Sequence, residues 1–260
     1  RDDVESRGLG DVYKRQGTGY LNNGKNYNNY FGRIYQARYL SGIVAGMKTQ
    51  TNKIGYVAAQ DSSNSEVTGG IDAFALGVYS VNSQAQIYVK VTNSWYDETA
   101  EKEASELLLD MGCDVIAQHC DTVYPQTLAQ EKGVYSIGYN SDMSKDAPQS
   151  CLCSVVWNWS AYYTAAVQSV IDGSWDGSNY YGGMNENLVS ITDLADFCAE
   201  GTKEKVEEAK KQILSGENGV FDGVIETNTG ETVGKEGTTL DDATITGGIN
   251  WYFKTVSVVE

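Results

Sequence analysis

Hydrophobic residues occur along the chain in short apolar runs that alternate with longer stretches of helical spacing. Four runs are short and bounded by polar turns, as buried parallel strands are: 53–59, 86–92, 115–117 and 134–138. Stretches with apolar residues three or four positions apart separate these runs: 66–81, 97–111 and the residues after 122. The resulting strand–helix alternation from Lys53 to Tyr139 predicts a parallel sheet with right-handed crossovers.

Segments on both sides extend this pattern. Ile34, Leu40, Ile43 and Met47 predict a helix whose small residues permit close packing on a sheet, and residues 17–30 read as a loop. The remaining elements that the pattern predicts are a strand at 151–156, a helix at 159–171, short strands at 180–182 and 188–191, a charged helix at 203–214 and a strand-like 251–253. This turn-rich tail is too irregular to form a doubly wound domain alone.

Two neighbouring strands end in hydrogen-bonding side chains. The run 115–117 is followed by Gln118-His119-Cys120-Asp121-Thr122, and the run 134–138 by Tyr139-Asn140-Ser141-Asp142. Open α/β sheets bind small polar ligands at the carboxyl ends of their strands. The pattern therefore indicates a ligand site that contains His119, Asp121, Asn140 and Asp142.

Each of these residues also has a purely structural interpretation. His119, the single histidine, either hydrogen-bonds a base edge or caps backbone groups, and catalysis is disfavoured because Cys120 lies on the opposite strand face. Asp121 either caps a helix that starts at Thr122 or accepts from a ligand N–H. Asn140 and Asp142 either form Asx turns or contact the ligand.

Two tryptophans follow strands at the same predicted edge. Trp95 and Trp157 offer flat faces, and stacking on a nucleobase contributes roughly 1–3 kcal/mol per contact. The alternative is that they fill a core or hinge, which suits Trp159 and Trp251 better. Arg33 and Arg38 are five positions apart on a helix, so at most one faces the site, and pairing with surface acids is expected for them.

Composition narrows the function classes. The chain has 260 residues, 41% of them hydrophobic, which is enough for one or two domains. A net charge of −16 argues against nucleic acid as a partner. Five cysteines make an odd number, and Cys151-Leu152-Cys153 lacks zinc-site spacing, so buried free thiols and no metal or cofactor are expected. No Walker motif and no apolar run of membrane-spanning length occurs.

The sequence resembles the basic membrane protein (BMP) family of ABC-transporter substrate-binding lipoproteins from about Tyr30 to Lys254. Several motifs occur in family-like order: YFGRIYQARYLSGIVAG (30–46), KIGYVAA (53–59), GGIDAFALGVYSVN (69–82), NSWYDETAEKEA (93–104), VIAQHCD (115–121), EKGVYSIGYNSDM (131–143) and SVVWNWSAYY (154–163). Members are similar to purine-nucleoside receptors, and relatives with a Gln-His-Cys/Thr-Asp variant look like adenine binders.

The resemblance implies a periplasmic-binding-protein-like (type I) α/β fold with two doubly wound lobes joined by hinges. Residues 1–16 look like a non-native, adapter-like leader. Residues 17–51 and 158–260 would be the remnant of an incomplete lobe one, and 52–157 would be lobe two. Elements that precede this N-terminally truncated fragment would supply an acidic motif and an aromatic residue. Apolar surface from Ile34 to Met47 and around Trp251 should then be poorly covered.

The function that the resemblance implies is capture of a purine base or nucleoside between the lobes and delivery to ABC permease subunits. No chemistry is needed, so an enzyme is not expected. The location would be periplasmic or at the cell surface, with a lipid on an N-terminal cysteine outside this sequence. Alternatives are a sensing lipoprotein without transport and a nucleoside-cleaving enzyme that uses Asp121 and Asp142.

Two positions bear on the choice between a nucleoside and a free base. Asp142 corresponds to a residue that, in nucleoside-binding relatives, looks suited to a ribose hydroxyl pair. Trp157 stands where those relatives carry a lysine that reaches the sugar. An indole supplies no charge, so this departure favours a free purine base or another flat heterocycle.

Overall fold

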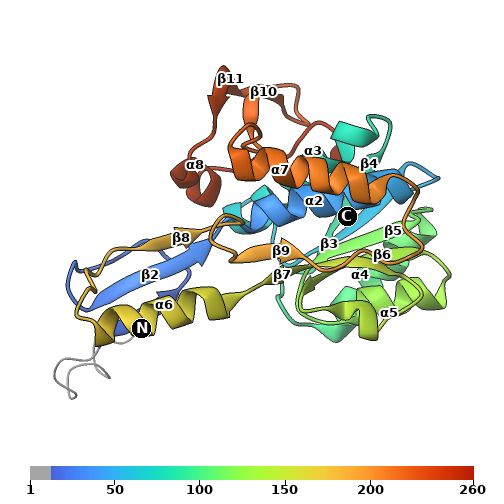
Figure 1. Ribbon diagram of the computed structural model, residues 1–260. Helices are drawn as coiled ribbons and strands as arrows, with labels where there is room; N and C mark the ends of the chain where they lie inside the picture. Colours follow the sequence, from blue (N-terminus) through green and yellow to red (C-terminus); the bar gives the residue numbers. More distant parts are fainter. Residues whose placement is uncertain (1–12) are drawn as a thin grey trace. The chain divides into compact units, whose positions relative to one another are not determined.

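The computed structural model describes residues 13–260, which form two compact units (Figure 1). The smaller unit contains the residues up to Arg33 together with Asn158–Val189. The larger unit contains Ile34–Trp157 and Ser190–Glu260. Residues 1–12 of the expected leader lie outside the described residues.

A mainly parallel sheet of seven strands organises the larger unit. Its order is β12 (Val256–Val259), β4 (Gln86–Val91), β3 (Lys53–Ala58), β5 (Val115–His119), β6 (Tyr135–Asn140), β7 (Cys151–Trp157) and β9 (Val189–Ile191). Every pair from β12 to β7 is parallel, which confirms the predicted α/β class. The chain leaves β3 towards β4 and leaves β5 towards β6, so connections diverge between β3 and β5. Such a switch point is where open sheets bind ligands.

Helices cover both faces of this sheet. After β4 and β5 come α4 (Glu98–Asp110) and α5 (Tyr124–Glu131), and Leu108 of α4 is buried with Val57 and Ile116 of the sheet. On the other side lies α3 (Ser65–Val81), which begins after β3. Asn64 caps α3 by accepting from two backbone N–H groups, and Asp97 caps α4 by accepting from the Ala100 N–H at 3.0 Å, as its position after a strand predicts.

The predicted first helix, α2 (Ile34–Lys48), packs on the sheet at β6 and β7, as its small residues predict, and it also approaches α3 closely. A Cβ at Gly42 would collide with the Phe74 carbonyl oxygen, and one at Gly77 with that of Tyr39. Because α3 covers one side of α2 and α7 (Thr202–Ser215) another, the apolar side chains of α2 are buried. The expectation of a poorly covered Ile34–Met47 surface is therefore wrong.

The C-terminal segment belongs to the larger unit. An antiparallel hairpin of β10 (Asp222–Glu226) and β11 (Thr232–Thr239) is followed by α8 (Asp242–Gly247) and by β12, which pairs with β4. Of the strand-like 251–253, Phe253 makes an isolated bridge to Thr227. The compact units thus differ from the predicted lobes, because α2 and residues 190–260 pack with the sheet of 52–157.

In the smaller unit, β1 (Lys14–Gly17), β2 (Tyr27–Gly32) and β8 (Tyr180–Gly182) form a parallel three-stranded sheet beside α6 (Trp159–Ile171). Stacked tyrosines join these elements, with 4.4 Å between the ring centroids of Tyr30 and Tyr162. Arg15 donates to the Ala166 carbonyl oxygen at 2.5 Å. The last residues of the expected leader are therefore part of this sheet, and β2 occupies a segment that was predicted to be a loop.

A buried carboxyl on α3 gives a test of this packing. Asp72 is fully buried and accepts from the Phe253 N–H at 2.7 Å, and burial raises its pKa well above the ordinary value. A folded-state pKa above the unfolded one means that stability is fullest at acid pH and falls as the pH rises towards the folded pKa. Asp72→Asn keeps an acceptor and removes the charge, so it should raise the free energy of unfolding at neutral pH by about 1–3 kcal/mol.

Urea denaturation at pH 4 and pH 7 measures this effect, with the exposed Asp110→Asn as the matched control. The gain should shrink towards acid pH, where the unfolded-state carboxyl is also protonated. A destabilised Asp72→Asn at neutral pH would contradict the interpretation.

Candidate functional site

The carboxyl ends of β3, β5 and β6 meet at the switch point of the larger unit. His119 at the end of β5 is in register with Ala58 at the end of β3. The residues that follow β5 and β6 approach each other there, because the Asn140 Nδ2 donates to Asp121 Oδ1 at 2.5 Å. The sheet thus brings two of the predicted site residues into direct contact.

Asp121 is a partner of Asn140 and not a helix cap. The helix after β5 begins at Tyr124, and Val123 at its N-cap position makes no side-chain cap. Glu101 holds the intervening turn by accepting from the Thr122 hydroxyl at 2.6 Å. Asp121 and Asn140 remain exposed, and Asn140 has the left-handed φ of 65° that asparagine tolerates. Desolvation raises the pKa of Asp121, although the Asn140 hydrogen bond opposes the rise.

Asp142 has a turn-forming role. It accepts from the Ser144 N–H at 3.0 Å and caps the short 3₁₀ helix η1 (Met143–Lys145). The hydrogen bonds from Ser144 lower its pKa. The Asx-turn interpretation is confirmed for this residue, and contact with a ligand stays a prediction.

His119 is enclosed by aromatic rings. Its side chain is fully buried, with ring centroids 5.8 Å from Trp95 and 4.6 Å from Tyr139. Nδ1 lies 3.5 Å from the Tyr56 hydroxyl, whereas Nε2 has no hydrogen-bond partner among residues 13–260. Burial, and secondarily the charge of Arg38, hold the pKa of His119 well below its usual range, so the imidazole is neutral.

Arg38 lies under the same carboxyl edge of the sheet, a position that the sequence pattern did not predict. Its side chain is fully buried, it donates to the Gln118 carbonyl oxygen at 2.6 Å, and its guanidinium lies 4.0 Å from the Tyr139 ring centroid. Nε and Nη2 are buried without a hydrogen-bond partner in the described part of the chain. The expected surface pairing is therefore wrong for Arg38. Arg33 fits it better, with Glu186 at 3.9 Å.

The two tryptophans occupy different positions along this edge. Trp157, at the end of β7, donates its indole N–H to the Tyr139 hydroxyl. In the β6–β7 register its neighbour Val156 is opposite Asn140, so Trp157 lies close to the Asp121–Asn140 pair. Trp95 is half-buried and packs on the core under α4. Its contact with His119 places it at the far side of the same aromatic row.

Glu66, in the first turn of α3, is a site residue that the strand-end pattern missed. Burial raises its pKa to about 7, while the positive charge of Arg38 opposes the rise and the negative charge of Asp121 adds to it. The order of strands in the sheet places the β3–α3 turn beside the end of β5. The sequence predicts that β3 and β5 are parallel, but it does not show that they are neighbours.

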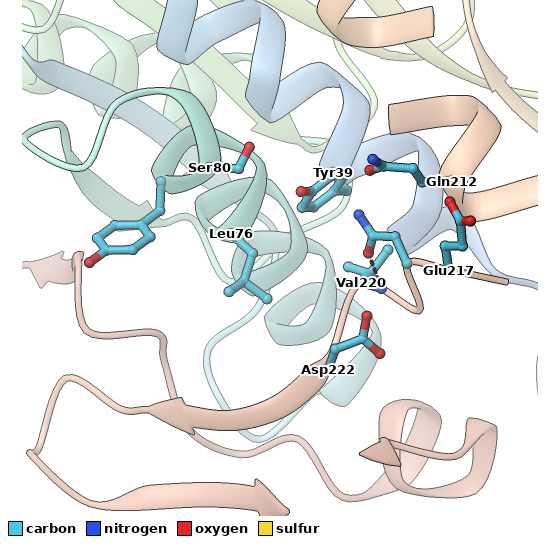
Figure 2. A pocket seen from close by; sticks show the side chains of 9 residues that line it. Tyr39, Leu76, Ser80, Gln212, Glu217, Val220 and Asp222 are labelled. Carbon is cyan, nitrogen blue, oxygen red and sulfur yellow. Dashed lines mark hydrogen bonds between the residues drawn. The ribbon is translucent and has the colours of Figure 1, made fainter. Parts of the chain in front are cut away.

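A separate hollow of about 430 Å³ lies between α2, α3 and the segment that leads into the hairpin (Figure 2). Tyr39 of α2 and Leu76 of α3 line it, with Gln212, Glu217 and Asp222 from the C-terminal segment. Its lining residues come from helix sides and the hairpin start, whereas the six predicted residues end or follow strands of the sheet. The hollow is therefore distinct from the switch-point edge.

The cysteines are free thiols, and four of the five are buried. Burial raises the pKa of the Cys113 thiol to about 12, so it is held as the neutral form. Within residues 13–260 no three His, Cys, Asp or Glu side chains are grouped as metal ligands, and no helix has the length and apolar character to cross a membrane.

A parallel α/β sheet with polar side chains around its switch point is the arrangement at which open sheets bind small ligands. Residues 12–220 match the family described as ABC transporter substrate-binding protein PnrA-like (Bmp), and the chain belongs to this family. The resemblance that the sequence motifs indicate is thereby confirmed. The proteins of this family are described as substrate-binding components of ABC transporters.

Two curated relatives carry different ligand names. The chain is 37% identical over 82% of its length to a Haloferax volcanii protein named ABC transporter glucose-binding protein TsgA13, and covers 54% of that protein. It is 35% identical over 93% of its length to a Brucella abortus protein named purine-binding protein, and covers 68% of that one. The chain thus spans about half of the first relative and about two thirds of the second.

Solved structures confirm the periplasmic-binding-protein-like fold. A Bacillus halodurans transcriptional activator of the comK gene matches with a TM-score of 0.73 and 20% identity, over 81% of this chain and 72% of that one. A Conexibacter woesei ABC-transporter solute-binding protein matches with a TM-score of 0.66 and 19% identity, over 82% and 72% of the two chains. Identities this low carry the fold and no ligand.

The burial of His119 leads to a prediction about its titration, which is simple to test because the sequence contains one histidine. The imidazole NMR signals should show no titration between about pH 5.5 and 8 in the folded protein, because both burial and Arg38 disfavour the charged ring. Arg38→Met should move the pKa of His119 upward by removing the nearby cation. The urea-unfolded protein, which should titrate near the ordinary value of about 6.5, is the control. A midpoint near that value in the native protein would refute the burial argument.

Proposed function

We propose that this protein is a transport receptor that captures a flat, uncharged heterocycle and presents it to ABC permease subunits. A free purine base is the preferred ligand, ahead of a nucleoside. The observation that carries the proposal is the hydrogen-bonded Asp121–Asn140 pair beside Trp157 at the switch point of a substrate-binding-family sheet. The name of the Brucella relative supports purine as the ligand class. A periplasmic or cell-surface location with a lipid anchor belongs to the same proposal.

The chemistry of the pair suits the edge of a base. Asn140 uses one N–H on Asp121 and keeps a second N–H and its carbonyl oxygen for a ligand, and Asp121 keeps further acceptor capacity. A bound ligand would cover these exposed groups, and a ligand that leaves covered hydrogen-bonding groups unpaired is rejected more strongly than apolar fit alone achieves. The Asp121–Asn140 pair would therefore supply orientation and specificity.

Trp157 would supply contact area. Its hydrogen bond to the Tyr139 hydroxyl fixes the indole before a ligand arrives, which reduces the entropy lost on stacking. Trp157 stands where the nucleoside-binding relatives that the sequence resembles carry a lysine. The sugar of a nucleoside would therefore find no charged partner at this position. We therefore place a free base ahead of a nucleoside.

A sugar is the second ligand class, because the Haloferax relative is named a glucose-binding protein. Sensing without transport would use the same site and differ in the partner protein. The nucleoside-cleaving alternative has less support, since Asp121 is engaged by Asn140 and Asp142 caps η1. Incubation with adenosine and inosine followed by detection of free base separates an enzyme from a receptor.

Titration calorimetry with adenine, hypoxanthine, adenosine, inosine and glucose tests the ligand class. Trp157→Ala should weaken purine binding by about 5- to 150-fold, the factor that corresponds to a stacking contact of about 1–3 kcal/mol. Trp251→Ala, at a tryptophan that precedes β12 and does not end a strand of the sheet, is the matched control and should leave the Kd unchanged. Binding of glucose in place of purines, or equal loss in both variants, would overturn the proposal.

A further inference from the structure

Glu66 lies on the face of α3 that covers the buried part of the site. It is one helical turn before Gly70, and residues four apart share a helix face. A Cβ at Gly70 would come within 2.7 Å of His119 Cε1 and 3.7 Å of Arg38 Nε, so this face is in direct contact with both side chains. Glu66 therefore lies next to them at the carboxyl edge of the sheet, close enough to Asp121 to be affected by its charge.

The groups next to Glu66 include unused hydrogen-bonding capacity. Both Arg38 and His119 have fully buried side chains. Three of their nitrogen atoms have no hydrogen-bond partner in residues 13–260: Arg38 Nε, Arg38 Nη2 and His119 Nε2. Across the same described stretch, the Glu66 carboxyl accepts no hydrogen bond, and its side chain is only half-buried. Buried polar groups are normally satisfied, so such a concentration of unpaired groups marks a place where a polar molecule binds.

We infer that Glu66 is a specificity-determining residue that binds the hydrogen-bonding edge of the ligand and selects an edge with a donor beside an acceptor. This inference rests on the proposed purine function and assigns a residue and a base class to it. Adenine presents such an edge, with its amino group next to a ring nitrogen. Guanine presents two neighbouring donors on its N1 and amino group.

Selection follows from the two protonation states of a carboxyl. A neutral carboxylic acid offers one donor and one acceptor side by side, which complements adenine, whereas a carboxylate offers two acceptors, which complement guanine. Burial raises the pKa of Glu66 to about 7, so both states are populated near neutral pH. Affinity for the two bases should therefore change with pH in opposite directions.

Charged and titratable groups on the neighbouring elements define this environment. Arg38 of α2 favours the carboxylate, whereas Asp121 after β5 favours the neutral acid. Burial raises the pKa of Tyr139 of β6, and the Glu66 charge adds to this rise, so Tyr139 is also close to Glu66. His119 of β5 is held neutral by burial and by Arg38, and it adds no charge.

Calorimetry with adenine and guanine at pH 6 and pH 8 tests the inference. With a pKa of about 7, Glu66 is about nine-tenths protonated at pH 6 and about one-tenth protonated at pH 8, so the adenine Kd should rise about tenfold across this range. Guanine binding should strengthen over the same range. Glu66→Gln, which permanently offers a donor beside an acceptor, should bind adenine equally at both pH values.

Glu66→Ala should weaken adenine binding at pH 6, and Glu103→Gln on the exposed side of α4 is the matched control that should keep the wild-type pH profile. Thermal melts of each variant establish that it is folded. The same pH dependence in Glu66→Gln as in the wild type would overturn the role of Glu66 while leaving purine binding intact. Failure of the wild type to bind either base at any pH would overturn the purine proposal and this assignment with it.

Discussion

The switch-point edge depends on one buried cation. Transfer of a guanidinium from water into a protein interior costs several kcal/mol, and such a group persists only where other interactions offset that cost. Arg38 has a charge-assisted hydrogen bond to the Gln118 carbonyl oxygen and the face of the Tyr139 ring. Burial keeps His119 neutral and raises the pKa of Glu66, and the charge of Arg38 adds to the first effect and opposes the second. The protonation states of His119 and Glu66 therefore depend on the position of Arg38.

Topology explains how residues far apart in sequence reach this region. The chain adds β4 on one side of β3 and then returns to place β5 on the other side, so the turns after β3 and β5 become neighbours. Glu66 follows the first of these strands and Asp121 the second. Asn140 and Trp157 arrive from β6 and β7, the next strands along the sheet. The polar residues at the ends of β3, β5, β6 and β7 therefore gather at one location in the larger unit.

Local patterns predicted much of this architecture. The helices that become α2, α3, α4 and α6 and the strands β3 to β7 were predicted to within about three residues, because apolar periodicity and polar turns are local signals. Four kinds of feature were not predicted. The Asn- and Tyr-rich β2 has the composition of a loop, and β12 forms through pairing with β4, about 170 residues earlier, which no local signal reports. The burial of Arg38 and the nearness of Glu66 depend on strand order, which periodicity does not contain. Asp121 resembled a cap because it follows a strand, but the helix begins only at Tyr124, after a turn that the buried Glu101–Thr122 contact holds.

The glycine contact between α2 and α3 has a consequence for motion. Gly42 and Gly77 bring backbone against backbone, so neither helix can slide past the other by changing a side-chain rotamer. Arg38 is carried by α2 and Glu66 by α3, and the two helices therefore behave as a single rigid block. Any adjustment to an arriving molecule falls to the exposed turns that hold Asp121 and Asn140. Arg38 and Glu66 are thus held in fixed positions, whereas Asp121 and Asn140, which are exposed to solvent, can adjust.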